Sequence, residues 1–166
     1  RPPPKVIWFH GNRVLDQELE TSYGDETRNR LYLKVVSRAL LHDTLRCEAT
    51  SSELIDPVSR NVSIELYLKP RTVDITTTPG PLSAGKTHQL QCVTSGSVPP
   101  ARITWLLEGE SLRDAVTSTA ETSNTTTSVL SFRPRSANNG EMLTCRAENK
   151  RFLGGLLEDR RRLNVT

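Results

Sequence analysis

The chain has 166 residues, a formal net charge of +3 and 35% hydrophobic residues. This length suits one or two domains. The small charge, with acidic and basic residues intermixed, argues against a nucleic-acid partner, and no apolar stretch of about 18 residues is present to span a membrane.

Two similar sets of short segments follow each other along the chain. The first set contains Trp8 and Cys47, and the second contains Trp105 and Cys145. The two tryptophans lie 97 residues apart and the two cysteines 98. A repeat of about 100 residues with a Cys…Trp…Cys frame is typical of immunoglobulin-like β-sandwiches, in which the tryptophan belongs to the core. Trp8 and Trp105 are therefore predicted to be core tryptophans.

Apolar and polar residues alternate in the second copy, as expected for strands that face a core on one side. The residues expected to share this core are Leu90, Cys92, Ile103, Trp105, Leu107, Leu130, Phe132, Leu143, Cys145 and Ala147. Turn formers separate the segments, and no long run has helical periodicity. We predict an all-β chain with two tandem immunoglobulin-like β-sandwiches. About 40 residues between tryptophan and the following cysteine leave room only for the compact seven-strand type.

The first copy is predicted to lack its N-terminal strands. Cys92 precedes Trp105 by 13 residues, and the same offset before Trp8 falls upstream of Arg1. We therefore expect a partial domain over residues 1–69, from its third strand onward, and a complete domain over 70–166.

The junction between the two copies is expected to be short and stiff. Its flanking apolar residues predict a last strand, then a first strand: Val62, Ile64, Leu66 and Leu68 before the junction, Val73 and Ile75 after it. Lys69 and Pro70 lead from the last strand into the first strand. A linker of two or three residues allows little freedom.

The cysteines indicate the compartment. If Cys92 and Cys145 are bonded, the disulfide stabilises the second domain by about 4 kcal/mol in the chain-entropy model, and the protein belongs outside the cell or on its surface. The alternative is a pair of reduced thiols in an intracellular sandwich domain. Cys47 is expected to pair with a cysteine upstream of this chain; its alternative is a free buried thiol.

One segment matches a phosphate-binding motif. Residues Gly80–Thr87 fit G-x-x-x-x-G-K-[ST], a motif that binds phosphate only where it opens a helix. Here an alternating segment that ends at Cys92 follows, and Pro81 lacks an N–H donor. We predict a turn that leads into a strand, and no nucleotide.

No catalytic or metal-binding pattern is found. His10, His42 and His88 are not at metal-ligand spacing, and His10 has the parity of a structural residue at a strand end. Nucleophile-elbow and zinc-protease motifs do not occur. The sequence predicts a protein that is not an enzyme and that has no cofactor or metal.

The surface offers several candidate features. Asn61, Asn124 and Asn164 begin N-x-[ST] glycosylation sequons, and Asn124 is the best candidate because it lies in a polar run. The basic residues 150–151 and 160–162 suit an acidic partner, a sulfated glycan or a solvated strand end. The apolar residues with outward parity either form a contact patch or are covered by neighbouring loops; they are Ile7, Phe9, Tyr32, Leu106, Val129 and Met142. The sequence does not identify which residues bind a partner.

Several motifs resemble those of the sidestep family. The resemblance lies in Gly96–Trp105 (GSVPPARITW), Pro81–Gly85, Thr126–Phe132, Leu143–Asn149 (LTCRAEN) and Leu66–Pro70. Sidestep-type proteins are anchored cell-surface molecules with several immunoglobulin domains, and beaten-path-type receptors recognise them in axon guidance and synaptic partner choice. Nephrin-like and nectin-like adhesion proteins share the Pro-Pro-Ala…Trp opening and remain an alternative.

This resemblance implies that the chain holds the second and third domains of an extracellular region, with a membrane anchor elsewhere. In the family the receptor docks mainly on the first, variable-type domain, so no receptor-binding residue is transferred to this chain. Its two domains are then expected to act mainly as a stiff stalk.

Overall fold

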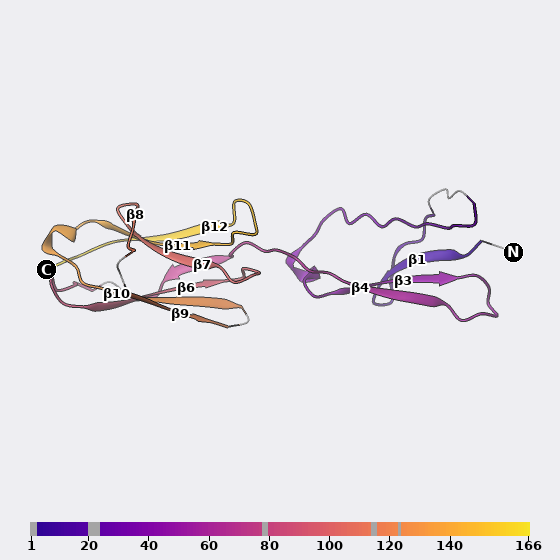
Figure 1. The fold of residues 1–166 in the computed structure, drawn as a ribbon, viewed down its shortest axis with the longest axis horizontal. Coiled ribbons are helices and arrows are strands. Elements are labelled where there is room, and N and C mark those ends of the chain that lie inside the picture. Colours follow the sequence, from indigo (N-terminus) through magenta and orange to yellow (C-terminus); the bar gives the residue numbers. More distant parts are fainter. Residues whose placement is uncertain (1–2, 20–23, 78–79, 114–115, 123) are drawn as a thin grey trace. The chain divides into compact units, whose positions relative to one another are not determined.

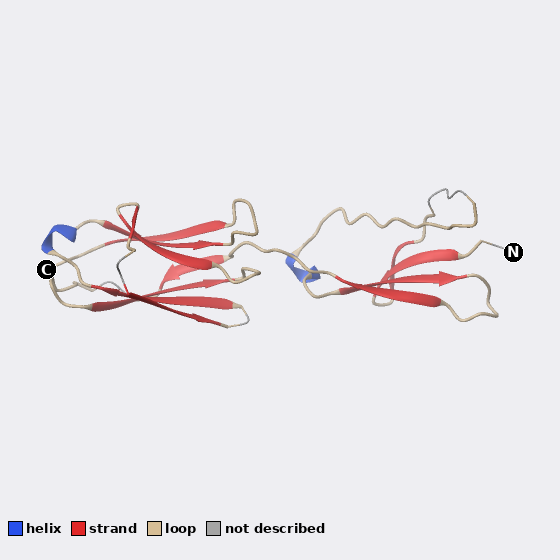
Figure 2. Ribbon diagram, in the orientation of Figure 1, coloured by secondary structure: helices blue, strands red, loops and turns tan. Residues whose placement is uncertain are grey.

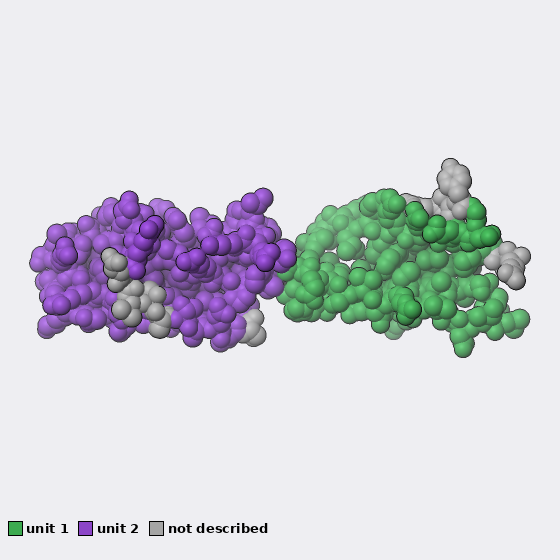
Figure 3. Space-filling view, viewed as in Figure 1, with its two compact units in different colours: residues 1–66 green, residues 67–166 purple. Residues whose placement is uncertain are grey.

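The computed structural model describes residues 3–19, 24–77, 80–113, 116–122 and 124–166. Two compact units make up the chain, Arg1–Leu66 and Tyr67–Thr166 (Figures 1 and 3). Each is built from antiparallel strands, with two short 3-10 helices, η1 (Arg38–Leu40) and η2 (Ser136–Asn138), between strands (Figure 2). The chain is therefore all-β with tandem immunoglobulin-like units.

The second unit is a sandwich of two four-stranded sheets. The first sheet has the order β5-β6-β10-β9, formed by β5 (Thr72–Ile75), β6 (His88–Ser95), β10 (Thr125–Phe132) and β9 (Val116–Glu121). The second sheet has the order β12-β11-β7-β8, formed by β12 (Leu156–Arg162), β11 (Met142–Glu148), β7 (Arg102–Leu107) and β8 (Glu110–Ser111). The two-residue β8 is an addition to the seven strands expected in this region.

Strict alternation explains why this sandwich forms. Along β10, every second side chain is buried, from Thr126 to Phe132. Such a strand presents one face to the core and the other to water. The buried core contains Ile75, Leu82, Leu90, Cys92, Trp105, Leu130, Phe132, Leu143, Cys145, Leu163 and Val165. Ile103 and Leu107 pack against it, as predicted from their parity.

The first unit contains one four-stranded sheet in the described residues. Its order is β2-β1-β3-β4, formed by β2 (Arg13–Asp16), β1 (Lys5–His10), β3 (Thr44–Thr50) and β4 (Val58–Ser63). The β1–β2 hairpin turns at Gly11, whose φ of 60° suits glycine. Trp8 lies opposite Cys47, as Trp105 lies opposite Cys145 in the second unit.

The first unit departs from one strand expectation and lacks one strand that the second unit has. Leu31–Leu33, the counterpart of Leu130–Phe132, is not in a strand. In the second unit β10 pairs with β6 and β9, whereas the described part of the first unit has no strand in the position of β6. The last strand also ends at Ser63, not at Leu68.

The chain between the units is anchored on both sides. Ile64 donates to the carbonyl of Asp43 and accepts from the N–H of His42. Leu68 exchanges two hydrogen bonds with Val98 at 2.8 and 3.0 Å, which places Leu68 in the second unit. Only residues 65–67 lie between these two anchored positions, so the tether is short.

Candidate recognition surfaces

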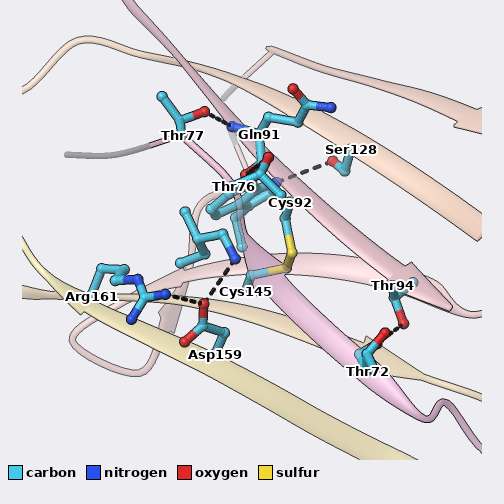
Figure 4. Close-up of a disulfide and its surroundings, with 12 residues drawn as sticks. Thr72, Thr76, Thr77, Gln91, Cys92, Thr94, Ser128, Cys145, Asp159 and Arg161 are labelled. Atoms are coloured by element: carbon cyan, nitrogen blue, oxygen red, sulfur yellow. Dashed lines mark hydrogen bonds and ion pairs between the residues drawn. A yellow bond between two sulfur atoms is a disulfide. The ribbon is translucent and has the colours of Figure 1, made fainter.

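The disulfide of the second unit lies at the centre of its core (Figure 4). Cys92 and Cys145 are bonded and fully buried, and Trp105, 3% exposed, pairs directly with Cys145 across the sheet. The indole Nε1 of Trp105 donates to Ser128 Oγ at 3.1 Å. Since β7 and β10 belong to different sheets, this bond and the disulfide both join the two layers.

A second polar contact closes one edge of the sandwich. The backbone N–H of Ile75 in β5 donates to Asp159 Oδ2 in β12 at 2.8 Å, and Arg161 forms an ion pair with the same oxygen at 3.2 Å (Figure 4). The three arginines at residues 160–162 are therefore not all available to an acidic partner. Its middle member neutralises a carboxylate that links the two sheets.

The outer face of the β7–β11–β12 sheet holds an ion cluster. Arg160 and Arg146 each approach a different carboxylate oxygen of Glu158 at 2.7 Å. Their hydrogen bonds, that of Arg160 first, lower the pKa of Glu158. Two guanidiniums share this one carboxylate, so the cluster keeps a net positive charge.

Asn149 holds the β11–β12 loop in place. Its side chain is 2% exposed, and its Nδ2 donates to the carbonyls of Leu68 at 2.7 Å and Val98 at 2.8 Å. Its Oδ1 accepts the N–H of Arg151 at 2.9 Å. One amide thereby joins three segments that are distant in sequence. The sequence signal for this residue is only its place at the end of the LTCRAEN motif.

The first unit presents a less covered sheet. Trp8 is half-buried and donates from Nε1 to the carbonyl of Asn29 at 3.2 Å. Cys47 beside it is half-buried and has no disulfide partner among the described residues. Burial raises the pKa of its thiol. His10, the predicted structural histidine, contacts Asp43 through Nε2 at 2.9 Å.

In the segment that matches the phosphate-binding motif, backbone N–H groups already donate hydrogen bonds within the chain. Leu82 and Ala84 donate to the carbonyls of Asn164 and Thr166, and Gly85 donates to that of Pro134. The segment leads into strand β6, as predicted, and not into a helix. These N–H groups have no free hydrogen to offer a phosphate. Elsewhere in the described residues, no group of three or more His, Cys, Asp or Glu side chains is arranged to hold a metal ion.

The family follows from a comparison with known domains. Residues 67–154 match the model of the CD80-like C2-set immunoglobulin domain. The chain belongs to this family. The matched C2-set domain coincides with the unit that holds the Cys92–Cys145 disulfide.

Similar proteins include nephrin and solved structures with immunoglobulin domains. Nephrin of Mus musculus is 23% identical over 158 residues, which are 90% of this chain and 12% of nephrin, so the chain spans a small part of that relative. The structure "Rst D1-D2" has a TM-score of 0.65 at 16% identity, covering 99% of this chain and 87% of that one. A complex of Dpr2 Ig1-Ig2 with DIP-Theta Ig1-Ig3 has a TM-score of 0.53 at 18% identity, covering 98% and 54%.

The apolar residues predicted to face outward behave differently from one another. In the C2-set domain Leu106 is 5% exposed, so it is one of the covered residues and not part of a contact patch; its partners in the sheet are Thr144 of β11 and Ser111 of β8. In the first unit Tyr32 is 69% exposed, whereas Phe9 lies beneath the guanidinium of Arg46 at 4.6 Å. The six residues therefore do not form one exposed patch.

The three sequon asparagines are all exposed. Asn61 lies in the edge strand β4, and Asn164 follows the end of β12. Asn124 directly precedes β10, and its carbonyl accepts the N–H of Gly96 at 3.0 Å. The described chain contains no helix that is long and apolar enough to cross a membrane.

Proposed function

We propose that this chain is part of the extracellular region of a cell-surface recognition protein that binds another immunoglobulin-superfamily protein and is not an enzyme. The observation that carries the proposal is the C2-set domain with a buried disulfide that joins its two sheets. Disulfides of this kind persist in oxidising compartments.

We propose further that the protein is a sidestep-like ligand for beaten-path-type receptors in axon guidance or synaptic partner choice. The motifs over residues 96–105 and 143–149 support this assignment. The short tether supports a stalk role for the two units, because only residues 65–67 lie between the anchored Ile64 and Leu68.

A nephrin- or nectin-like adhesion molecule is the second candidate. The similarity to mouse nephrin over 90% of this chain favours it. Such a protein would bind adhesion partners on a facing cell through its own immunoglobulin domains. Its partners differ from those of a sidestep-like ligand, so one binding screen separates the two candidates.

The screen uses the full extracellular region and this chain, immobilised separately. Each is tested by biolayer interferometry against a panel of beaten-path-type receptors and a panel of nephrin- and nectin-type ectodomains. Binding of the extracellular region to a beaten-path-type receptor supports the sidestep-like function. Binding only to nephrin- or nectin-type partners supports the second candidate and contradicts the first.

The completion of the first unit by an upstream strand is a further part of the proposal. We propose that a cysteine upstream of this chain pairs with Cys47 and that its strand covers the half-buried Trp8 and Cys47. The register supports this arrangement, because Trp8 faces Cys47 just as Trp105 faces the bonded Cys145. Peptide mapping of the full protein under non-reducing conditions tests it, since a Cys47 peptide that carries a free thiol would contradict the pairing.

A further inference from the structure

The hairpin loops that follow the two cysteine-bearing strands share one turn design. In the β3–β4 loop (Ser51–Pro57), the carbonyl of Ser52 accepts the N–H of Ile55 and its Oγ accepts that of Leu54, both at 3.3 Å. In the β11–β12 loop (Asn149–Gly155), the carbonyl of Asn149 accepts the N–H of Phe152 at 3.1 Å and its Oδ1 accepts that of Arg151 at 2.9 Å. The same polar turn thus opens both loops.

Both loops expose an apolar pair at their tips. Leu54 is 96% exposed and Ile55 61%, while Leu153 is 99% exposed and Phe152 38%. The pairs occupy positions that match to within one residue. Leu54 and Phe152 each follow their cysteine by seven residues, whereas along the shared turn Ile55 is the equivalent of Phe152. Single exposed apolar residues are common on protein surfaces, but paired ones at loop tips in both units are a candidate contact.

The two loops carry opposite charges next to these pairs. The β3–β4 loop has Glu53 and Asp56, and the β11–β12 loop has Lys150 and Arg151. Glu53 and Lys150 occupy the same position of the shared turn, directly after its first residue. All four side chains are exposed, and within the described residues none of them forms an ion pair. The loops therefore match in apolar content and complement each other in charge.

The β11–β12 loop is also preorganised. Asn149 ties its start to two other segments, as described above. At its end Gly155 is buried, and a Cβ there would lie 2.9 Å from the carbonyl oxygen of Phe152. A loop that is held in this way loses little conformational entropy when its tip becomes buried.

We propose that these two loops bind each other between two copies of this chain. The β3–β4 loop of one copy packs Leu54 and Ile55 against Phe152 and Leu153 of the other copy, and Glu53 and Asp56 face Lys150 and Arg151. A two-fold axis would repeat this contact and close a dimer, whereas contacts without closure would extend an assembly. The contact is separate from receptor recognition and holds for either function proposed above.

Sedimentation of the chain tests the proposal. A Cys47→Ser background prevents disulfide-linked dimers, and 50 mM salt preserves the charge contribution. We expect the mass to rise above the 18.5 kDa of one copy as the concentration increases from about 10 µM to 1 mM. Glu53→Lys/Asp56→Lys and Lys150→Glu/Arg151→Glu should each weaken association by roughly tenfold or more. The four-fold variant, in which both loops are reversed, should restore it.

A matched control separates the loops from net charge. Glu18→Lys/Glu121→Lys makes the same change of charge as Glu53→Lys/Asp56→Lys, but at exposed positions outside both loops, and it should leave association unchanged. A monomer throughout the concentration range would overturn the proposal. Equal weakening by the control pair, or a four-fold variant that stays monomeric, would also overturn it. None of these results depends on receptor binding, so this proposal and the proposed function fail separately.

Discussion

The side-chain amide of Asn149 lies 2.7 Å from the carbonyl oxygen of Leu68 and is almost completely buried. This contact fastens the first residues of the C2-set domain to the loop that follows β11. Removing the amide would leave buried carbonyls without a donor. A buried unsatisfied group destabilises a protein by more than a typical hydrogen bond stabilises it.

We therefore expect Asn149→Ala to lower the free energy of unfolding by about 2–3 kcal/mol. Urea denaturation followed by tryptophan fluorescence measures this change. Asn164→Ala is the matched control, because Asn164 is exposed, and it should change stability by less than about 0.5 kcal/mol. Equal stabilities of the two variants would contradict the anchoring role of Asn149.

Cys47 should be the one reactive thiol of this chain, and a slow one. Cys92 and Cys145 are bonded, and burial raises the pKa of Cys47, which reduces its thiolate fraction at neutral pH. Titration with a thiol reagent at pH 7.5 should find one thiol per chain. The reaction should accelerate in denaturant and with rising pH. Labelling that is as fast in the native chain as in the unfolded one would contradict this description.

Acid should weaken the contribution of Glu158 to stability. Its pKa is lowered in the folded protein, mainly by the hydrogen bonds of Arg160 and Arg146. A group of this kind stabilises the fold above its unfolded pKa, and the benefit is lost as the pH falls through its folded pKa. The difference in unfolding free energy between the wild type and Glu158→Gln should thus shrink from about pH 6 to about pH 3. A difference that is constant over this range would refute the assignment.

Asn124 should carry an N-linked glycan when the chain is secreted from eukaryotic cells. Its sequon lies at the exposed start of β10, and a sugar there would project into solvent. Asn124→Gln should remove one increment of mass that a glycosidase also removes. Gel electrophoresis measures this change of mass, and Asn61→Gln and Asn164→Gln on the same gel test the two other sequons. An unchanged mass of Asn124→Gln would exclude this site.

Residues with strict alternation were the most predictable from sequence. The parity of Leu90, Cys92, Leu130 and Leu143 placed each of them in the core where the structure has them. Parity also assigned Leu106 to the outer face of its sheet, but it does not tell what covers that face. Leu106 is 5% exposed in the structure, and its partner strand, the two-residue β8, has too weak a pattern to predict.

Features that depend on contacts distant in sequence were not predictable. Leu31–Leu33 has the composition of a strand, but a strand needs a neighbour to pair with. The partners of Asn149 lie at Leu68 and Val98, which no local pattern connects to it. The matching apolar pairs at Leu54 and Phe152 do have a signal in the sequence, namely their equal spacing from the repeated cysteine.

The most direct test of the proposed function compares two affinities for one beaten-path-type receptor. The extracellular region that contains this chain and the chain alone are titrated against the same immobilised receptor. A sidestep-like ligand with these units as its stalk predicts saturable binding by the extracellular region and none by the chain. Failure of the extracellular region to bind any beaten-path-type receptor would contradict the assignment, and binding by the chain itself would contradict the stalk role.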